Sequence, residues 1–440
     1  MARPPVWLSV LIAPGTCPSA LLEKAQPLTA GADRACLIDG DRLLRRLQAL
    51  GEVGATGDGG VCRLALTDAD REGRDLVSGW MRELGLRVCI DLIGNVVGVW
   101  DAEGGDGLVL TGSHIDTVAC GGLYDGNLGV LAGLEAIESL REAGFRPTRS
   151  LGVAFFTNEE GARFSPDMLG SLVFADQLSV EDALVTRAID GPLLGAELER
   201  AGYAGCERFS IDTLKAFVEL HIEQGPILEA VQSPIGVVLG VQGIHWLEVE
   251  FIGEARHAGT TPMAMRRDAG AAAFALAAGV ANLAKRVGGD QLATVGRVVL
   301  EPNLVNVVAR RATMTVDLRN TDGDLLRCAA AEVADLALSI AEASGLGLEI
   351  RTLVDLDPVV FDPAVVDLVR EEAHHLGLST YDLPSGAGHD AQILARVCPA
   401  GMIFVPSAGG ISHNPREHTD ARELVQGAEV LTSVLRRLAA

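Results

Sequence analysis

Apolar and polar positions in the first half of the chain alternate between helical spacing and short apolar runs. Such runs are typical of buried strands, whereas repeats every three to four residues predict amphipathic helices. The predicted elements are helices at 42–50, 68–84 and 126–143, a hairpin at 87–100 that turns at Gly94-Asn95, and strands at 108–111 and 151–157. This rhythm indicates an α/β domain with a mainly parallel sheet, whose functional groups follow the carboxyl ends of strands.

The rhythm changes near Leu239. The next predicted elements are strands at 245–251, 292–300, 312–318 and 348–354, with helices at 267–285 and 324–343. Their βαββαβ order predicts an inserted ferredoxin-like domain over 239–355, with hinges near Leu239 and Asp355. Helices at 365–376 and 421–438 and a strand at 400–405 then resume the first pattern. We therefore expect a discontinuous catalytic domain, 37–238 and 356–440.

Composition narrows the function classes. The chain has 440 residues, of which 48% are hydrophobic and only 4% aromatic, so two domains with aliphatic cores are expected. A net charge of -23 argues against nucleic-acid binding. Apolar runs stay well below ~18 residues, so no membrane partner is expected. The 8 cysteines include no CxxC pair, which favours a reducing, cytoplasmic location.

The first 36 residues form an N-terminal extension that we expect to be disordered. Residues 6–13 are apolar and follow Arg3, which weakly resembles a signal peptide, but Pro14 ends the run.

Candidate chemistry begins where the strand at 108–111 ends. His114 follows this strand, and Asp116 shares its face if the backbone is extended. A carboxylate beside an imidazole can orient it for a metal ion. Asp125 comes eleven residues after His114, where a helix N-cap is the alternative interpretation. A satisfied buried histidine is the alternative for His114.

Three more motifs follow strand-like segments. Glu159 and Glu160 are adjacent carboxylates that are costly to bury without a cation, although an exposed acidic turn is the alternative. His221 precedes Glu223, Gln224 and Gly225-Pro226, and His413 follows the strand at 400–405. Histidines mixed with carboxylates suit Zn, Mn or Co, and a bridging carboxylate can hold two ions ~3.5–4 Å apart.

These motifs resemble the metallo-aminoacylase and carboxypeptidase superfamily. Within it they are most similar to the branch of N-carbamoyl-L-amino-acid hydrolases, allantoate amidohydrolases and bacterial-type β-ureidopropionases. The likeness runs from Ile38 onward and includes residues 54–67, residues 91–98 and the His-Ile-Glu-Gln-Gly-Pro motif at 221–226.

The resemblance implies a role for each matching residue. Two divalent metal ions are implied, one held by His114, Asp125 and His221 and the other by Asp125, Glu160 and His413. Asp116 is expected to orient His114. Glu159 is expected to be the general base that takes a proton from the attacking water and passes it to the leaving nitrogen, a task worth roughly 10²–10⁴-fold in rate.

Substrate residues are implied in the same way. His257 would reach the active site across a homodimer interface formed by the inserted domain and stabilise the oxyanion. Asn306 and Arg319 would bind the substrate carboxylate with Gln224 nearby, since a guanidinium pairs both oxygens. Gly388 would allow close backbone approach to the substrate.

Other positions remain open or lie apart from the site. His389 and Asp390 either contact the substrate or support its loop. His374 and His375 are expected on the surface, and His245 is expected to be structural. Two departures from the family pattern, Ala309 and His418, could alter the pocket rim.

The sequence therefore predicts hydrolysis of the ureido group of an N-carbamoyl-L-amino acid to amino acid, ammonia and carbon dioxide. Allantoate and β-ureidopropionate are alternative substrates. An aminoacylase, dipeptidase or aminopeptidase is a further alternative, against which His221 argues because peptidase branches more often place a carboxylate there. A non-catalytic binding protein is disfavoured because all five ligands and Glu159 are present.

Overall fold

The computed structural model describes residues 38–440 except 104 and 106, so the extension predicted at 1–36 lies outside it. In the described part of the chain, no helix combines the length and apolar character needed to cross a membrane. The helices are α1 (Gly40–Glu52), α2 (Asp68–Glu83), α3 (Asn127–Glu142), α4 (Leu169–Phe174), α5 (Val180–Leu184), α6 (Leu194–Ala201), α7 (Ile227–Val231), α8 (Ala269–Val287), α9 (Gly323–Ser344), α10 (Pro363–His375), α11 (Asp390–Leu394) and α12 (Ala421–Ala439).

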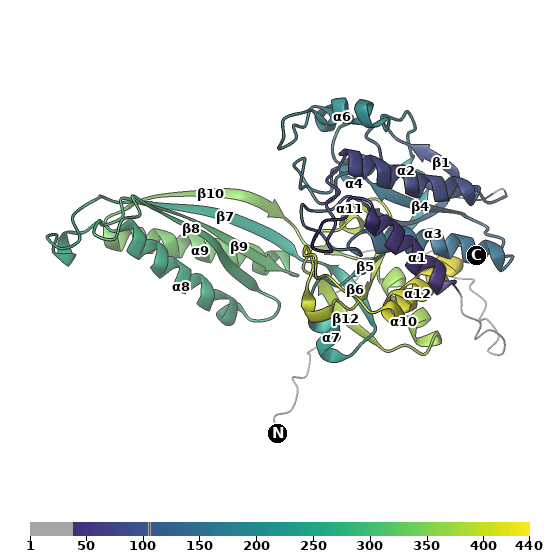
Figure 1. Cartoon of the computed structure of the whole chain (residues 1–440). Helices are drawn as coiled ribbons and strands as arrows, with labels where there is room; N and C mark the ends of the chain where they lie inside the picture. The colour runs from purple at the N-terminus through teal and green to yellow at the C-terminus, as the bar shows by residue number, and fades with distance from the viewer. Residues whose placement is uncertain (1–37, 104, 106) are drawn as a thin grey trace, which may run out of the picture. The chain divides into compact units, whose positions relative to one another are not determined.

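The strands form two sheets (Figure 1). They are β1 (Arg87–Ile90), β2 (Val96–Trp100), β3 (Leu108–His114), β4 (Ser150–Phe156), β5 (Leu214–Ile222), β6 (Ile235–Val241), β7 (Gly243–Ile252), β8 (Leu292–Glu301), β9 (Arg311–Asn320), β10 (Gly347–Leu356), β11 (Val359–Val360), β12 (Thr380–Ser385) and β13 (Ala400–Val405).

The larger sheet has the order β1-β2-β4-β3-β5-β13-β6-β11, and β12 also pairs with β6. Its centre, β4-β3-β5-β13, is parallel as predicted. The flanking pairs β1-β2, β2-β4, β13-β6 and β6-β11 are antiparallel. The predicted hairpin explains one flank, because a short turn can join only antiparallel neighbours.

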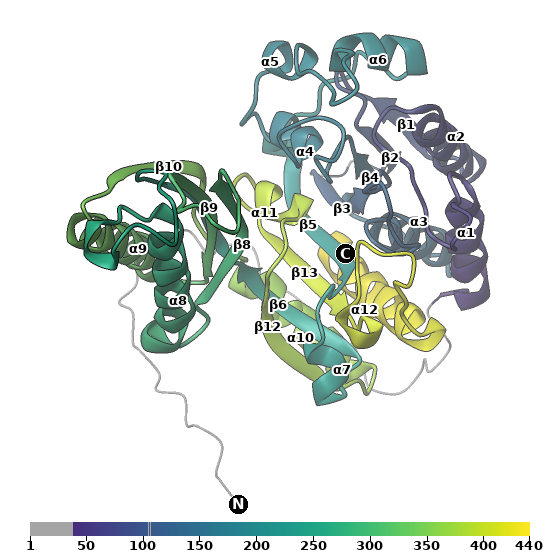
Figure 2. The ribbon, with the colours of Figure 1, turned by 60° about the vertical axis from the view of Figure 1, so that its left-hand side comes forward.

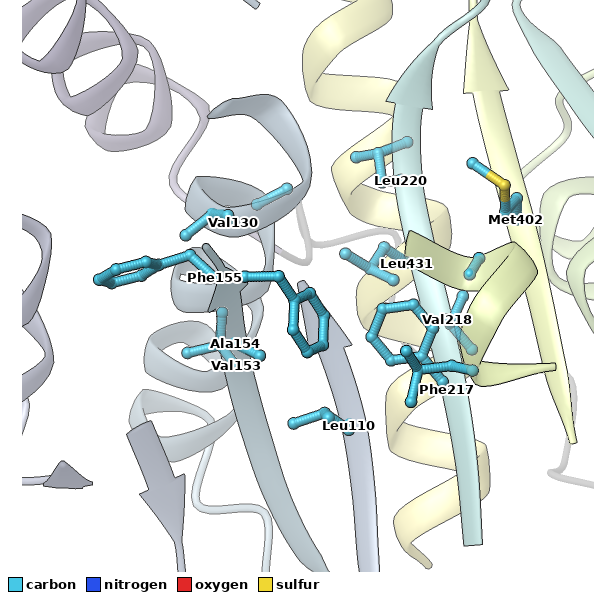
Figure 3. Close-up of a cluster of buried hydrophobic side chains, with 14 of the residues drawn as sticks. Leu110, Val130, Val153, Ala154, Phe155, Phe217, Val218, Leu220, Met402 and Leu431 are labelled. Carbon is cyan, nitrogen blue, oxygen red and sulfur yellow. The ribbon is translucent and has the colours of Figure 1, made fainter. Parts of the chain in front are cut away.

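Helices cover both faces of this sheet because side chains alternate along each strand. Leu220 of β5 faces α3 and α12, where Figure 3 shows it near Leu431. These two leucines are fully buried, and each such side chain contributes roughly 1.5–3 kcal/mol. Glu219 points the other way and accepts a hydrogen bond from the Ala391 backbone N–H of α11 at 2.8 Å. The alternation along β5 therefore places apolar side chains on one face of the sheet and a polar side chain on the other.

The second sheet, β10-β7-β9-β8, is antiparallel throughout. Exposure alternates residue by residue along β9, whose Ala312, Met314, Val316 and Leu318 are buried. These side chains share a hydrophobic cluster with α8 and α9, and both helices lie against the same face of the sheet (Figures 1 and 2). The strands and helices follow one another in the predicted order.

The second sheet is inserted between neighbouring strands of the first. The chain leaves β6 at Val241 and begins β7 at Gly243. After β10 it returns as β11, where Val359 pairs with Val241 and Val360 with Gly240. The segment between β6 and β11 therefore starts and ends at one place on the larger sheet.

Candidate active site

The parallel strands at the centre of the larger sheet carry polar side chains to one edge. Carboxyl ends of neighbouring parallel strands meet at the same edge, where α/β proteins place their sites. The residues brought there are His114 at the end of β3, Glu159 and Glu160 after β4, His221 near the end of β5 and His413 after β13. Asp125 joins them from the loop before α3.

Asp125 lies between the histidines. Its Oδ1 is 3.2 Å from His221 Nε2 and 3.6 Å from His114 Nε2, and its Oδ2 is 3.3 Å from His413 Nε2. His413 Nε2 is also 3.4 Å from Glu160 Oε2. Two clusters result, each with all donor atoms within 4.8 Å of one another: His114, Asp125 and His221, and Asp125, Glu160 and His413. Asp125 is common to both.

Asp125 is not the N-cap of α3, which was the alternative interpretation. The N-cap is Gly126, with φ 66°, and no side chain caps the helix there. A Cβ on Gly126 would lie 2.4–2.5 Å from the His114 ring. The glycine therefore lets the chain pass His114 closely while the Asp125 carboxylate turns toward the histidines.

The carboxylates of the two clusters shift the pKa values of their neighbours. Burial acts to raise the pKa of Asp125, but hydrogen bonds from three histidines hold it well below its usual range. Burial and the Asp125 charge raise the pKa of Glu160 to about 7. The hydrogen bond to Asp125 raises the pKa of His413 to about 9. The carboxylates thus favour positive charge at both clusters, and this donor set fits divalent metal ions.

Glu417 and Ser412 support Asp125, although no role was predicted for either. Glu417 Oε1 accepts from the backbone N–H groups of Tyr124 and Asp125 at 2.9 and 3.2 Å. Ser412 Oγ lies 3.0 Å from Asp125 Oδ2 and 2.9 Å from Glu417 Oε2. Groups that hold a ligand in this way usually set metal affinity as well.

Gln224 contacts Asp125 and is itself held by Ser407. Gln224 donates from Nε2 to Asp125 Oδ2 at 2.8 Å and from its backbone N–H to Ser407 Oγ at 2.9 Å. Gln224 Oε1 is buried and has no hydrogen-bond partner among the described residues. Buried acceptors are usually paired, so an N–H group of a ligand would suit this oxygen.

The carboxylate of Asp116 binds the segment after β4, and it is the backbone of Asp116 that contacts the His114 ring. Its Oδ1 and Oδ2 accept from the backbone N–H groups of Glu159 and Glu160 at 3.2 and 3.4 Å. His114 Nδ1 instead contacts the Asp116 backbone carbonyl at 2.9 Å. A carbonyl only accepts, so Nδ1 carries the proton and Nε2 is left as the ligand atom.

Glu159 lies beside the first cluster, with Oε2 3.4 Å from His114 Nε2. Burial, together with the nearby acids Asp390 and Glu160, raises its pKa well above the usual range against the opposing effect of His114. A carboxyl group with a raised pKa is better matched to accepting and returning a proton near neutral pH.

His389 and Asp390 lie behind the site. The His389 ring packs edge-on against His221 with 4.6 Å between centroids, and its Nε2 is 2.8 Å from Ser385 Oγ. Asp390 is fully buried, and neither carboxylate oxygen has a hydrogen-bond partner within the described chain.

A cavity of about 130 Å³ opens onto the two clusters. Its lining residues are His114, Asp125, Glu159, Glu160, Asp167, His221, Gln224, Ala387, Gly388, His389 and His413. The five predicted ligands, Glu159, Gln224 and Gly388 therefore share one cavity, and Asp167 was not predicted.

The structure does not place His257, Asn306 or Arg319 on this cavity. His257 and Asn306 are exposed and lie on neighbouring segments of the second sheet. His257 forms a β-bridge with Val307, and Ala258 N–H donates to the Asn306 carbonyl at 2.9 Å. Arg319 pairs with Asp317 and donates to the Gly386 carbonyl at 2.5 Å. Arg319 therefore contacts the loop whose next two residues, Ala387 and Gly388, line the cavity.

The remaining four histidines do not line the cavity. His374 and His375 are exposed, and His245 pairs with Asp355 at 3.0 Å. His418 is exposed and packs edge-on against Tyr124, with 6.4 Å between ring centroids.

Residues 110–437 match the sequence profile of Peptidase family M20/M25/M40, and the chain belongs to this family of metal-dependent hydrolases acting on carbon–nitrogen bonds. It is 40% identical over 395 residues to an N-carbamoyl-L-amino-acid amidohydrolase of Rhizobium meliloti, covering 90% of this chain and 95% of the relative. It is 35% identical to an allantoate amidohydrolase of Bacillus subtilis, covering 89% and 96%. A crystal structure of a hydantoinase/carbamoylase family amidase from Burkholderia multivorans superposes with a TM-score of 0.89 at 43% identity, covering 91% of this chain and 98% of that one.

Proposed function

We propose that the protein hydrolyses the ureido group of N-carbamoyl-L-amino acids, releasing the amino acid, ammonia and carbon dioxide. The observation that carries the proposal is the pair of His/carboxylate clusters that share Asp125, with Glu159 beside them. The likeness to an N-carbamoyl-L-amino-acid amidohydrolase, which covers 90% of this chain, supports the choice of substrate class.

Two divalent ions, Zn, Mn or Co, fit the donor set. His114, Asp125 and His221 would hold one, and Asp125, Glu160 and His413 would hold the other. When bound, such ions polarise a scissile carbonyl and lower the pKa of water to about 7. Glu417 and Ser412 fix the shared carboxylate through the hydrogen bonds described above.

Glu159 is the general base in this proposal. Its carboxylate accepts a proton from the attacking water and later donates it to the departing nitrogen. Asp116 positions it by accepting hydrogen bonds from the backbone N–H groups of Glu159 and Glu160.

The substrate would be held by both sheets. Arg319 would pair with the carboxylate, Asn306 would assist it, and Gln224 Oε1 would accept an N–H of the ureido group. Gly388 would let the substrate approach its backbone closely. His257 Nδ1 accepts from the backbone N–H groups of Gly259 and Thr260 at 3.0 and 3.3 Å, so its proton is on Nε2. That free donor suits an oxyanion.

These assignments require the second sheet to act as a separate ferredoxin-like domain over residues 239–355. It would close over the catalytic domain, 37–238 and 356–440, and form the interface of a homodimer that delivers His257. Its own hydrophobic cluster and its single point of departure from the larger sheet support this division.

An activity screen tests the proposal. Purified protein reconstituted with Mn, Co or Zn is expected to release ammonia from N-carbamoyl-L-alanine. Allantoate is the second candidate, favoured by the likeness to an allantoate amidohydrolase, and N-carbamoyl-β-alanine and N-acetyl-L-alanine complete the panel. Turnover of the acetyl compound alone would replace the proposal with an aminoacylase, and failure on every ureido compound would end it.

A further inference from the structure

Asp167 is the one charged residue lining the active-site cavity that the proposed function leaves without a task. It is exposed to solvent, and no side chain in the described chain pairs with its carboxylate. Surrounding protein nevertheless raises the pKa of this carboxyl group by partial desolvation. An unpaired acid at the rim of a site that must admit an anionic substrate calls for an explanation.

The backbone holds Asp167 firmly at this rim. The residue before it is fixed by Asn158, whose Nδ2 donates to the Pro166 carbonyl at 3.1 Å. The residue after it, Met168, has a left-handed φ of 51° and donates its N–H to the Glu159 carbonyl at 2.7 Å. A bulky residue rarely adopts that conformation unless its surroundings impose it.

Two glycines confine the same segment. A Cβ on Gly161 would lie 2.8 Å from Asp167 Cβ, so the loop after Glu160 packs directly on Asp167. A Cβ on Gly388 would lie 3.2 Å from the end of the Met168 side chain. Asp167 therefore packs on the loop that carries the general base, and its neighbour Met168 packs on the loop beside the proposed substrate.

We propose that Asp167 selects substrates by the charge of their side chain, disfavouring a second carboxylate and favouring cationic or hydrogen-bond-donating groups. This inference rests on the proposed function. There, Arg319 beside Gly386 takes the substrate carboxylate and the two clusters take the ureido group. The side chain is then the part left to face the rim. An unpaired carboxylate there repels an anion and attracts a cation.

Three substrates with one reactive group test it: N-carbamoyl-L-alanine, Nα-carbamoyl-L-lysine and N-carbamoyl-L-glutamate. For Asp167→Asn we expect kcat/KM to rise for the glutamate compound and to fall for the lysine compound, each measured relative to the alanine compound in the same protein. The lysine-to-glutamate ratio of kcat/KM should fall roughly tenfold. Asp212→Asn, an exposed carboxylate away from the cavity, is the matched control and should change neither.

Salt provides a second readout on the unaltered protein. The lysine-to-glutamate ratio should shrink between about 10 mM and about 500 mM salt, and Asp167→Asn should remove most of that dependence. If the alanine compound is hydrolysed but the ratio moves less than about twofold in Asp167→Asn, Asp167 does not select by charge and the proposed function stands. If wild-type protein hydrolyses none of the three, both proposals fall.

Discussion

The side-chain amide of Gln224 donates from Nε2 to Asp125 Oδ2 at 2.8 Å, while its Oε1 is buried without a partner among the described residues. Gln224 thus contacts the carboxylate shared by both clusters and is also one of the residues that line the cavity. Gln224 holds this position with a left-handed φ of 58°, two residues after the end of the strand that carries His221.

Replacing Gln224 by Met, which keeps its length, should raise KM for N-carbamoyl-L-alanine about tenfold, because the ureido N–H loses its acceptor. Metal content should change little, since Ser412 and three histidines still contact Asp125. Steady-state kinetics and elemental analysis check both points. Gln232→Met is the control, as Gln232 has a similar φ of 56° on an exposed helix end. An unchanged KM would remove Gln224 from the substrate site.

Glu159→Gln should retain metal and lose roughly 10²–10⁴-fold in kcat, because the amide cannot accept the proton from water. Elemental analysis and single-turnover kinetics separate the two effects. Loss of metal in this variant would make Glu159 a ligand instead of the base.

Glu417→Gln should weaken metal binding by roughly 10–100-fold. Glu417 accepts from two backbone N–H groups and Ser412, and an amide nitrogen in place of one oxygen cannot accept from them all. Competition with a chelator measures the affinity, with Glu423→Gln of α12 as control. Equal affinities in both variants would show that the Asp125 loop holds its conformation without Glu417.

Arg319→Ala should raise KM sharply for N-carbamoyl-L-alanine but not for its methyl ester, which lacks the carboxylate charge. Arg319→Lys should recover part of the loss, because Lys keeps the charge without the paired geometry. Arg351→Ala removes a surface arginine of the same sheet and serves as control. Equal KM increases for acid and ester would indicate a structural effect.

Metal binding should release protons. His413 has a pKa raised to about 9 and Glu160 one raised to about 7, so in metal-free protein at pH 7.5 His413 is largely protonated and Glu160 mostly ionised. A protonated imidazole cannot ligate, so affinity should rise with pH until about 9. The pKa values of His114 and His221 are raised as well, so these imidazoles also contribute protons when a metal ion binds. Calorimetry in buffers of different ionisation enthalpy should therefore detect a net release of protons at pH 7.5. His413→Gln should lower that release by roughly one proton, and the same release in both proteins would show that His413 is not among the groups that lose a proton.

Local patterns predicted the elements that carry the site, because His114, Glu159 and His221 each follow or end an apolar strand. They did not predict β12, whose six residues include Pro384 and only two buried side chains, a weak strand signal. Glu417 received no role because its bonds to the Asp125 loop cross 292 residues, a separation that spacing alone does not reveal. The carboxylate of Asp116 was expected to contact the His114 ring, yet the Asp116 backbone carbonyl makes that contact. The carboxylate is engaged elsewhere, because the two acidic residues after β4 donate their backbone N–H groups to it.

The pairing of Val359 with Val241 brings together the two ends of a segment of more than one hundred residues. Because β6 and β11 are already antiparallel neighbours, a two-residue turn could replace everything between them without moving either strand. The larger sheet could thus be made as a minimal protein with both ligand clusters intact. Conversely, this junction is a natural place to graft a different substrate-recognition module onto the same hydrolytic core.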